Sequence, residues 1–393
     1  MSGELKNPNL GLIGKLFGAG KSRKKPEIEE TENYAVASQW QLMYWKFHRH
    51  KLAMIAVPVF TILLIIAIFC EFIAPYTPTE RFSKYKEAPP NGLHWVDAGG
   101  KFSFMPFVYE IDRFTDPVTF KRTFSYNTTV KYEMGFFVKG SPYKLWALIP
   151  TDIHLFGPKE PGAPYLLMGT DQLGRDLFTR IIYGTRVSLA FGVLSVMLTF
   201  VLGVTLGGLS GYLGGVVDNI IQRIIDLLLC IPTLPLWMAL AAALPRHWDP
   251  LFIYFGMIFV MSLIGWTGLA RVVRGKILSV REEDFTTAAR LCGATDARII
   301  FKHMLPSFAS YMIVNVTMSI PASILGETAL SFLGLGLQAP IVSWGVLLQD
   351  AQTIQALAMH PWLLFPVAFV ILTVLVFNFI GDGLRDAADP YAK

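Results

Sequence analysis

The sequence is dominated by long stretches without a charged residue, and this feature limits the chain to a membrane-spanning fold. The first of them, residues 52–70, contains no Asp, Glu, Lys or Arg. About 20 apolar residues in a helix cross a hydrocarbon core of roughly 30 Å. Of the 393 residues, 53% are hydrophobic and 16% are charged, against about 25% charged in an average soluble domain. The chain is therefore predicted to be all-α and transmembrane.

Six uncharged stretches are long enough to be predicted as membrane spans. In chain order they are residues 52–70, 187–213, 227–245, 251–270, 308–325 and 361–381. Glycines and prolines within them, such as Gly203, Gly207 and Pro232, predict close helix contacts and local kinks, which membrane helices tolerate.

The distribution of Lys and Arg predicts the orientation of these spans. Residues 1–51 carry nine Lys or Arg and the connection 271–306 carries seven, whereas the connection 331–360 carries none. Connections rich in Lys and Arg stay in the cytoplasm, although segments longer than about 60 residues cross largely regardless of charge. We therefore expect a multi-pass membrane protein with both termini in the cytoplasm.

Residues 76–168 differ in composition from the rest of the chain. Aromatic residues, proline and glycine are frequent, and the stretches 102–104 and 130–134 alternate with a period of two. This alternation is typical of strands. We expect a small periplasmic insert with short β-strands, which rests on the outer mouth of the pore, meets a delivery protein, or serves packing alone.

The connection 276–306 has the pattern of a short helix pair outside the bilayer. Acidic residues at 282–284, the last of them Asp284, load the N-terminal end of a helix. An apolar stripe follows at positions i, i+3, i+4 and i+7, formed by Phe285, Ala288, Ala289 and Cys292. Gly293 suits the left-handed position that ends a helix, and Pro306 helps to turn the chain back into the membrane. Such a face fits the groove of a partner protein or lies on the lipid surface.

Other charged residues lie near the predicted ends of spans. The segment 169–186 holds Asp171, Arg175 and Asp176. It is predicted either as a gate at the pore mouth or as an interfacial helix that Asp171 caps and in which Arg175 pairs locally. Glu327 follows the fifth predicted span and could instead begin another helix. Together with Trp344, these residues are candidates for the pore mouth or for a structural role.

Two further patterns are not interpreted as functional sites. Arg223 and Asp226 are i, i+3 neighbours and are predicted to form a structural ion pair. Residues 18–22 end like a phosphate-binding loop, but Lys15 stands where the loop needs its first glycine. We therefore expect no nucleotide on this chain. No nucleophile and base occur at a recognisable spacing, no metal ligands are evident, and the net charge of +5 does not indicate nucleic-acid binding.

Several of these stretches, in this order, resemble a known family of membrane proteins. Ala288-Ala289, Gly293 and Leu305-Pro306 resemble the "EAA" loop of ABC-importer permeases, with Thr287 in place of the motif's leading acidic residue. The stretches 72–76, 169–176, 214–218, 331–336, 343–345 and 383–386 are similar to the second, C-type permease of the oligopeptide/dipeptide/nickel family. The resemblance covers residues 40–75 and 165–393.

The resemblance implies a six-helix importer permease of a bacterial inner membrane that is not itself an enzyme. Its partners would be a second, similar permease, two cytoplasmic ATPase subunits that bind ATP and Mg, and an external solute-binding protein. The cargo would be a peptide or a related solute such as an oligosaccharide, an opine or a nickel chelate. The residues implied in coupling to the ATPase are Asp284, Phe285, Ala288, Ala289, Gly293, His303, Leu305 and Pro306.

The predicted organisation follows from these expectations. It comprises a cytoplasmic tail (1–51), a first span (52–75), the insert (76–168), an interfacial segment (169–186), a five-span core (187–383) with the coupling loop 276–306, and a second tail (384–393). Two other classes were weighed, an ion-coupled secondary transporter and a membrane sensor or enzyme that uses the insert. The first would need mid-membrane acids and internal repeats, and the second a polar catalytic cluster in 76–168.

Overall fold

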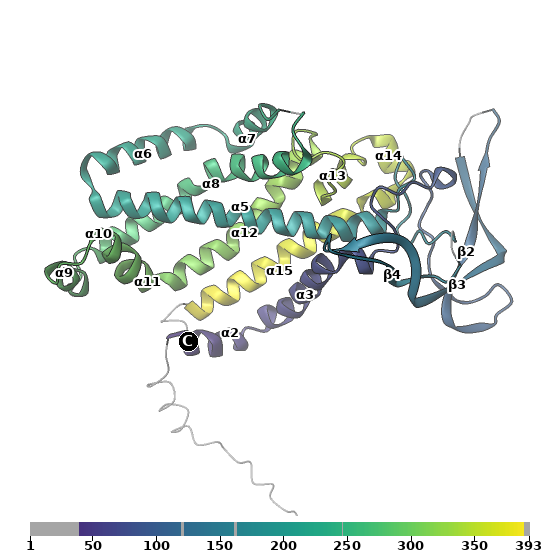
Figure 1. Cartoon of the computed structure of the whole chain (residues 1–393), viewed down its shortest axis with the longest axis horizontal. Coiled ribbons are helices and arrows are strands. Elements are labelled where there is room, and N and C mark those ends of the chain that lie inside the picture. The colour runs from purple at the N-terminus through teal and green to yellow at the C-terminus, as the bar shows by residue number, and fades with distance from the viewer. Residues whose placement is uncertain (1–38, 119–121, 161–162, 246, 389–393) are drawn as a thin grey trace, which may run out of the picture.

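The computed structural model describes residues 39–118, 122–160, 163–245 and 247–388, and shows a bundle of long helices with a β-sheet at one end (Figure 1). Five helical segments are long and apolar enough to cross a membrane. They are α3 (Lys51–Ile68), α5 (Leu177–Leu213), α8 (Pro250–Val280), α12 (Ala309–Phe332), and η3 (Pro361–Leu364) with α15 (Phe365–Ala388). The phosphate-loop-like stretch 18–22 lies outside the described residues.

A broken pair of helices is the sixth candidate span. α6 (Gly215–Cys230) and α7 (Thr233–Ala242) pass the length and hydropathy test together but are bent by 93°. The third predicted span, 227–245, therefore begins too late, because the helix pair starts at Gly215, whereas the kink predicted at Pro232 coincides with the break. The break lies at Ile231-Pro232, where proline cannot donate a backbone hydrogen bond.

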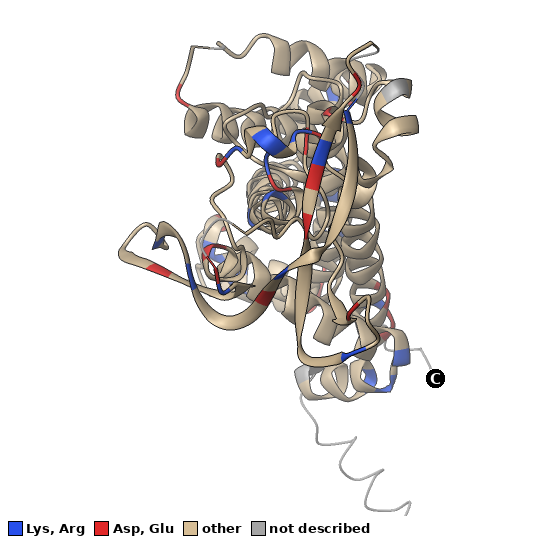
Figure 2. Cartoon of the chain, turned by 90° about the vertical axis from the view of Figure 1, so that its right-hand side faces the viewer, with Lys and Arg blue, Asp and Glu red and all other residues tan. Residues whose placement is uncertain are grey.

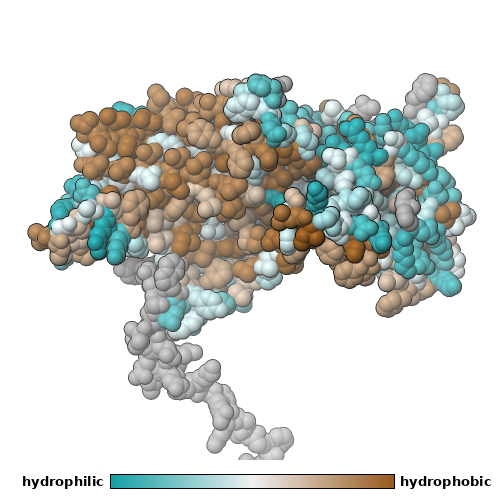
Figure 3. All heavy atoms as spheres, viewed as in Figure 1, coloured by the Kyte–Doolittle hydropathy of each residue, from teal (hydrophilic) through white to brown (hydrophobic). Residues whose placement is uncertain are grey.

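The two ends of the bundle differ in content (Figure 1). At one end, which we call the α9 end, lie α9 (Asp284–Leu291), α10 (Asp296–Arg298), α2 (Gln39–Arg49) and the last turn of α15. At the other, the sheet end, lie the strands with α13 (Trp344–Gln349) and α14 (Ile354–Met359). A broad apolar surface covers the helices between them (Figure 3). Seen from the sheet end, charged residues of both signs lie on strands and loops (Figure 2).

Three glycines bring α5 against α8. A Cβ added to Gly207 would lie 2.5 Å from the Ala270 carbonyl oxygen, and one on Gly211 would lie 2.8 Å from that of Arg274. A Cβ on Gly203 would meet the Leu269 side chain at 2.9 Å. Because the three recur every fourth residue, they form one stripe along α5. The predicted close helix contact is confirmed for Gly203 and Gly207.

The insert is an antiparallel sheet with the order β1-β2-β3-β4. Its strands are β1 (His94–Val96), β2 (Phe102–Thr115), β3 (Arg122–Leu145) and β4 (Ile149–Pro158). The predicted β-structure is confirmed, but the expectation of short strands was wrong, since β3 has 24 residues. The strand follows two partners in turn, β2 along its first half and β4 along its second.

Two helices run through charged residues that hydropathy had placed outside the spans. α5 begins at Leu177 and continues unbroken to Leu213, so the segment 169–186 is mostly the first part of that helix. α12 continues to Phe332, and Glu327 lies inside it rather than after it. Ser331 and Ser343 each donate a side-chain hydrogen bond of 2.7 Å to Glu327 Oε1. These hydroxyls pair one oxygen of the buried carboxylate, whereas Oε2 has no hydrogen-bond partner in the described part of the chain.

A buried ion network holds the sheet end of α5. The Asp171 carboxylate, which is fully buried, accepts hydrogen bonds from the backbone N–H of Arg175 at 2.9 Å and from its Nε at 2.6 Å. Arg180, 2% exposed, also donates to Asp171 and lies 3.4 Å from Asp350. Asp176, not Asp171, caps α5 by accepting from the Thr179 N–H at 2.8 Å. Burial raises the pKa of Asp176 to about 7.

Removing Arg180 should destabilise this end of the bundle. Arg180→Ala removes one of the two arginines that pair with the buried Asp171 carboxylate. We therefore expect the free energy of unfolding to fall by about 3 kcal/mol. Arg175→Ala is the matched control, because the more deeply buried Arg180 remains, and its loss should be smaller. Thermal unfolding of the purified protein measures both. Equal midpoints for Arg180→Ala and the unsubstituted chain would contradict the assigned role.

Candidate coupling site

The helix α9 begins and ends as its sequence predicts. Asp284 lies in its first turn, where negative charge stabilises the helix dipole, and Arg290 lies in its last turn. Gly293 follows with φ of +77°, the left-handed conformation that only glycine adopts without strain. Its N–H donates to the Arg290 carbonyl, and the Ala294 N–H donates to that of Ala289. The chain therefore reverses at 293–295.

Pro306 does not mark a second reversal. From Asp296 the chain follows an almost continuous helical path through α10, the π-helical turn η2 (Ile299–Met304), α11 (Leu305–Ser307) and α12. Pro306 lies in the first turn of α11, where its missing N–H costs little. The expected turn at Pro306 was therefore wrong, because the reversal had already occurred beyond Gly293.

Side-chain contacts fix α9 and the following α10 to the ends of two spanning helices, α5 and α8. The buried Thr286 hydroxyl donates to the Val280 carbonyl at 2.9 Å, which joins α9 to α8. The Tyr212 hydroxyl at the end of α5 donates to Asp296 at 2.7 Å. The Arg290 guanidinium lies 5.9 Å from the centre of the Tyr212 ring. α9 is thus held by groups from both α5 and α8.

A buried apolar cluster lies beneath these bonds. It contains Tyr212, Val273, Ile277, Ile299, Ile300, Met304, Leu305 and Phe308, with Ala289 packed against it. Leu305 therefore contributes to the core of this chain, and Ala289 is only partly open. His303 is half-buried and Pro306 is exposed.

The opposite side of α9 is exposed and apolar. We call it the α9 face and define it by Phe285, Ala288, Leu291 and Cys292, all of which are exposed. Leu291 is 84% exposed and Phe285 43%. Sequence reasoning missed Leu291 because it lies beside the i, i+3, i+4, i+7 stripe. An apolar patch on a segment that links two spans is typical of a protein interface or a membrane contact.

The candidates for the pore mouth lie together at the sheet end. Asp171 and Arg175 belong to the ion network described above, and Arg180 and Asp350, which the sequence analysis missed, complete it. Asp176 lies beside them as the N-cap of α5. Trp344 is fully buried and its backbone N–H donates to the Ser188 hydroxyl of α5 at 3.1 Å. The sequence could have revealed Arg180, because an arginine among apolar residues needs a buried partner of opposite charge.

The predicted ion pair of Arg223 and Asp226 is present but weak. Their closest atoms are 3.5 Å apart and the Arg223 side chain is 80% exposed. Asp226 makes a shorter contact of 2.5 Å with Arg271 of α8. At the α9 end, Arg274 also pairs with Asp218 at 2.5 Å. These two inter-helix pairs join α6 to α8, which the i, i+3 pattern could not reveal.

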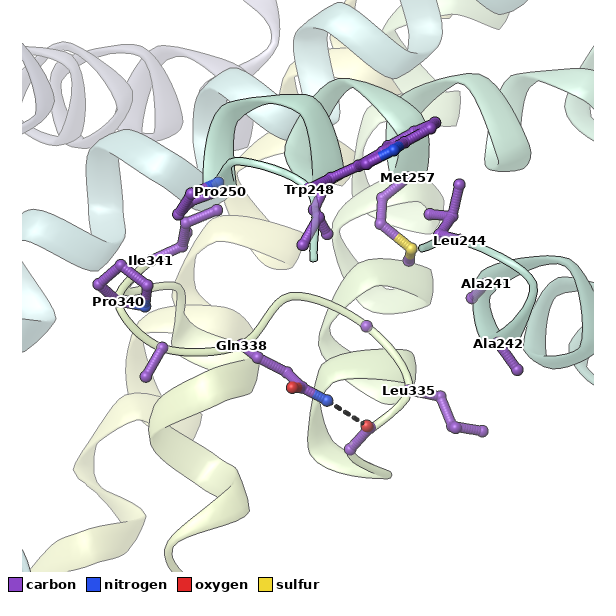
Figure 4. A pocket seen from close by; sticks show the side chains of 14 residues that line it. Ala241, Ala242, Leu244, Trp248, Pro250, Met257, Leu335, Gln338, Pro340 and Ile341 are labelled. Carbon is purple, nitrogen blue, oxygen red and sulfur yellow. Dashed lines mark hydrogen bonds between the residues drawn. The ribbon is translucent and has the colours of Figure 1, made fainter. Parts of the chain in front are cut away.

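A cavity of about 230 Å³ lies between the α7–α8 turn and the α12–α13 loop (Figure 4). Trp248 and Met257 line one side, and the loop 334–341 lines the other, where Gln338 donates to the Gly334 carbonyl at 2.8 Å. Among the residues that the structure describes, no group of three His, Cys, Asp or Glu is placed to hold a metal ion. The cavity has no charged lining residue.

Gly293→Ala should weaken the α9 end through backbone strain alone. A Cβ at Gly293 meets nothing within 4 Å, so the positive φ is its only cost, about 1 kcal/mol or more in the free energy of unfolding. Gly275→Ala in α8 is the control, because that position is equally open but has no positive φ, and alanine favours a helix. Equal thermal midpoints for the two variants would contradict the strain argument.

Comparison with known proteins identifies the architecture. The family of binding-protein-dependent transport system inner membrane components matches residues 203–393, and the N-terminal transmembrane domain of oligopeptide transport permease C matches residues 38–90. The oligopeptide permease OppC of Bacillus subtilis is 38% identical over 238 residues, 60% of this chain and 75% of the relative. The dipeptide permease DppC of the same organism is 43% identical over 224 residues, 56% of this chain and 68% of the relative.

A further relative and a solved structure are also similar to this chain. The glutathione permease GsiD of Pectobacterium atrosepticum is 41% identical over 226 residues, 58% of this chain and 73% of the relative. A chain of the MetNI methionine ABC transporter in inward-facing conformations aligns with 54% of this chain and 97% of its own length, at 18% identity and a TM-score of 0.41. The chain belongs to the permease subunits of binding-protein-dependent ABC importers, as a C-type permease of the oligopeptide/dipeptide/nickel family.

Proposed function

We propose that the α9 face is where this permease binds a cytoplasmic ATPase subunit. The observation that carries the proposal is an exposed apolar face on a helix that is itself attached to two spanning helices. Thr286 of α9 bonds to the end of α8, and Arg290 of α9 packs on Tyr212 at the end of α5, which also bonds to α10. A lipid-lying linker would need the apolar face but not the rigid attachment. A coupling element needs both, because a movement of the partner must reach the spanning helices.

The complete importer is proposed to contain several chains. A second, similar permease would complete the pore, two ATPase subunits would bind ATP and Mg, and a solute-binding protein would deliver the cargo at the sheet end. This chain would hold no cofactor of its own. In the cycle, closure of the ATPases moves α9, and the bonds of Tyr212 and Thr286 pass that movement to α5 and α8. Two states of the bundle then alternate in population as ATP is bound and hydrolysed.

The proposed cargo is a peptide. The relatives are named for the transport of oligopeptides, dipeptides and glutathione. These compounds share a peptide backbone and a free carboxylate. An ion-coupled transporter is not favoured by the family assignment, and neither is an enzyme that uses the insert.

The proposed orientation places the α9 end in the cytoplasm of a bacterium. α2 and the end of α15 lie at this end of the bundle, with α9 (Figure 1). If α6 and α7 count as one span, the chain crosses the membrane six times. An even number of crossings places α2 and the end of α15 on the same side. The Lys and Arg of the connection 271–306 favour the cytoplasmic side for it.

A charge on the α9 face should uncouple the permease from its ATPase. Leu291→Asp replaces a side chain that is 84% exposed, so the fold should persist, whereas a desolvated charge in an interface is costly. We expect a normal amount of permease in the membrane and at least a tenfold weaker capture of the ATPase subunit, which corresponds to about 1.4 kcal/mol. Co-purification with a tagged permease and ATP hydrolysis in vesicles measure the loss.

Ile354→Asp is the matched control for that experiment. Ile354 is 85% exposed and lies on α14 at the sheet end, so the same substitution at the same exposure should leave ATPase capture unchanged. Normal capture by Leu291→Asp would exclude the α9 face as the docking site. Loss in both variants would show that the effect is not specific to α9.

The orientation can be tested with a native thiol. Cys292 is exposed on the α9 face, and in a Cys230→Ser background a membrane-impermeant maleimide should label it only after the membrane is opened. A cysteine that replaces Phe104 of β2, which is 90% exposed, should be labelled from outside without that step. Labelling of Cys292 in intact, right-side-out vesicles would overturn the proposed orientation.

A further inference from the structure

The turn between β3 and β4 has an unusual composition. The five residues Leu145-Trp146-Ala147-Leu148-Ile149 are all apolar, whereas turns between strands in water are rich in Gly, Asn and Asp. Trp146 and Ala147 also have positive φ values of 52° and 61°, the positions that Asn-Gly would normally occupy. Because this turn departs both from the usual polar composition and from the usual residues at positive φ, we expect it to have a functional role.

The turn lies at the end of the first spanning helix. The Trp146 indole N–H donates to the Ile68 carbonyl at 2.8 Å, and its ring centre is 5.5 Å from that of Phe69. Ile68 is the last residue of α3, which has 18 residues and is about 27 Å long at 1.5 Å per residue. This length nearly equals the hydrocarbon thickness, so Ile68 marks the level at which α3 leaves the hydrocarbon.

The hairpin runs alongside the chain that follows α3, with its turn nearest to the helix end. Phe137, further from the turn on β3, has its ring centre 6.1 Å from that of Phe72, one helical turn beyond Ile68. His154 of β4 makes a hydrogen bond of 2.5 Å with the Ala74 carbonyl, further out again. The successive contacts at residues 74, 72 and 68 show that the hairpin descends along the chain that leaves α3.

The tip is exposed and continues an apolar surface. Leu148 is 78% exposed, Ile149 53% and Trp146 45%. The adjacent residues of α3 are exposed as well, with Ile65 and Ile68 each at 48%. The exposed Lys144, next to the turn, can extend its ammonium group to lipid headgroups while its stem stays apolar. Tryptophan is itself enriched at this level of membranes because its ring is apolar and its N–H is polar.

We propose that the β3–β4 turn inserts into the outer leaflet of the bilayer and anchors the sheet beside α3. The partner is lipid, because the tip is continuous with the surface of α3 and lies at the level where that helix leaves the hydrocarbon. The anchor fixes the position of the sheet at the pore mouth. The inference does not depend on which subunits bind the α9 face, so it can fail independently of the proposed coupling.

Spin-label accessibility in lipid nanodiscs tests the proposal. The permease, purified with its associated subunits and with Cys230 and Cys292 replaced by serine, receives one nitroxide label at Leu148→Cys, Ile153→Cys or Phe104→Cys. The probes are oxygen, which concentrates in lipid, and a water-soluble nickel chelate. We expect the ratio of oxygen to nickel accessibility to be several-fold higher at position 148 than at 104, with position 153 between them.

Two results would overturn the proposal. Nickel accessibility at 148 equal to that at 104 would place the tip in water. Exclusion of both probes at 148 would place it against a protein, such as the second permease or a solute-binding protein. Ile153 lies on β4 near the His154 contact and is 42% exposed, so its value shows whether the labelled hairpin is folded.

Discussion

The close contact of α5 with α8 is the constraint on which the rest of the structure depends. Hydrocarbon gives helices no hydrophobic reason to associate, so small residues that allow close approach drive their packing. Gly207 and Gly211 bring the α5 backbone against the carbonyls of α8. α5 has 37 residues and is about 55 Å long, so this contact joins the two ends of the molecule.

Each end of α5 carries a different attachment. At the sheet end, Arg180 is held between Asp171 and Asp350 and ties α5 to the loop after α13. At the α9 end, Tyr212 binds Asp296. A displacement of α9 therefore acts on a helix whose other end is fixed in a buried ion network. This geometry favours rotation of the bundle as a unit over bending within a single helix, as expected for alternating access.

The sequence predicted the helices and the α9 turn well because each depends on local patterns. Uncharged runs marked five of the spanning helices, and Gly293 marked the left-handed end of α9. The extents of α5 and α12 could not be predicted, since hydropathy does not show that Arg180 and Glu327 have buried polar partners, some of them outside the helix, such as Asp350 and Ser343. Leu291 was missed for another reason. Helical periodicity shows which residues share a face of the helix, but it does not show which face the rest of the chain buries.

The central claim is that the α9 face binds an ATPase subunit rather than lipid. Its most direct test uses Cys292, which lies on that face. A thiol-reactive photo-crosslinker attached to Cys292, in a Cys230→Ser background, is activated in native membranes, and the adduct is identified by mass spectrometry. The account predicts a crosslink to the ATP-binding subunit of the same importer. Crosslinks only to phospholipid would contradict it and make α9 a linker on the membrane surface.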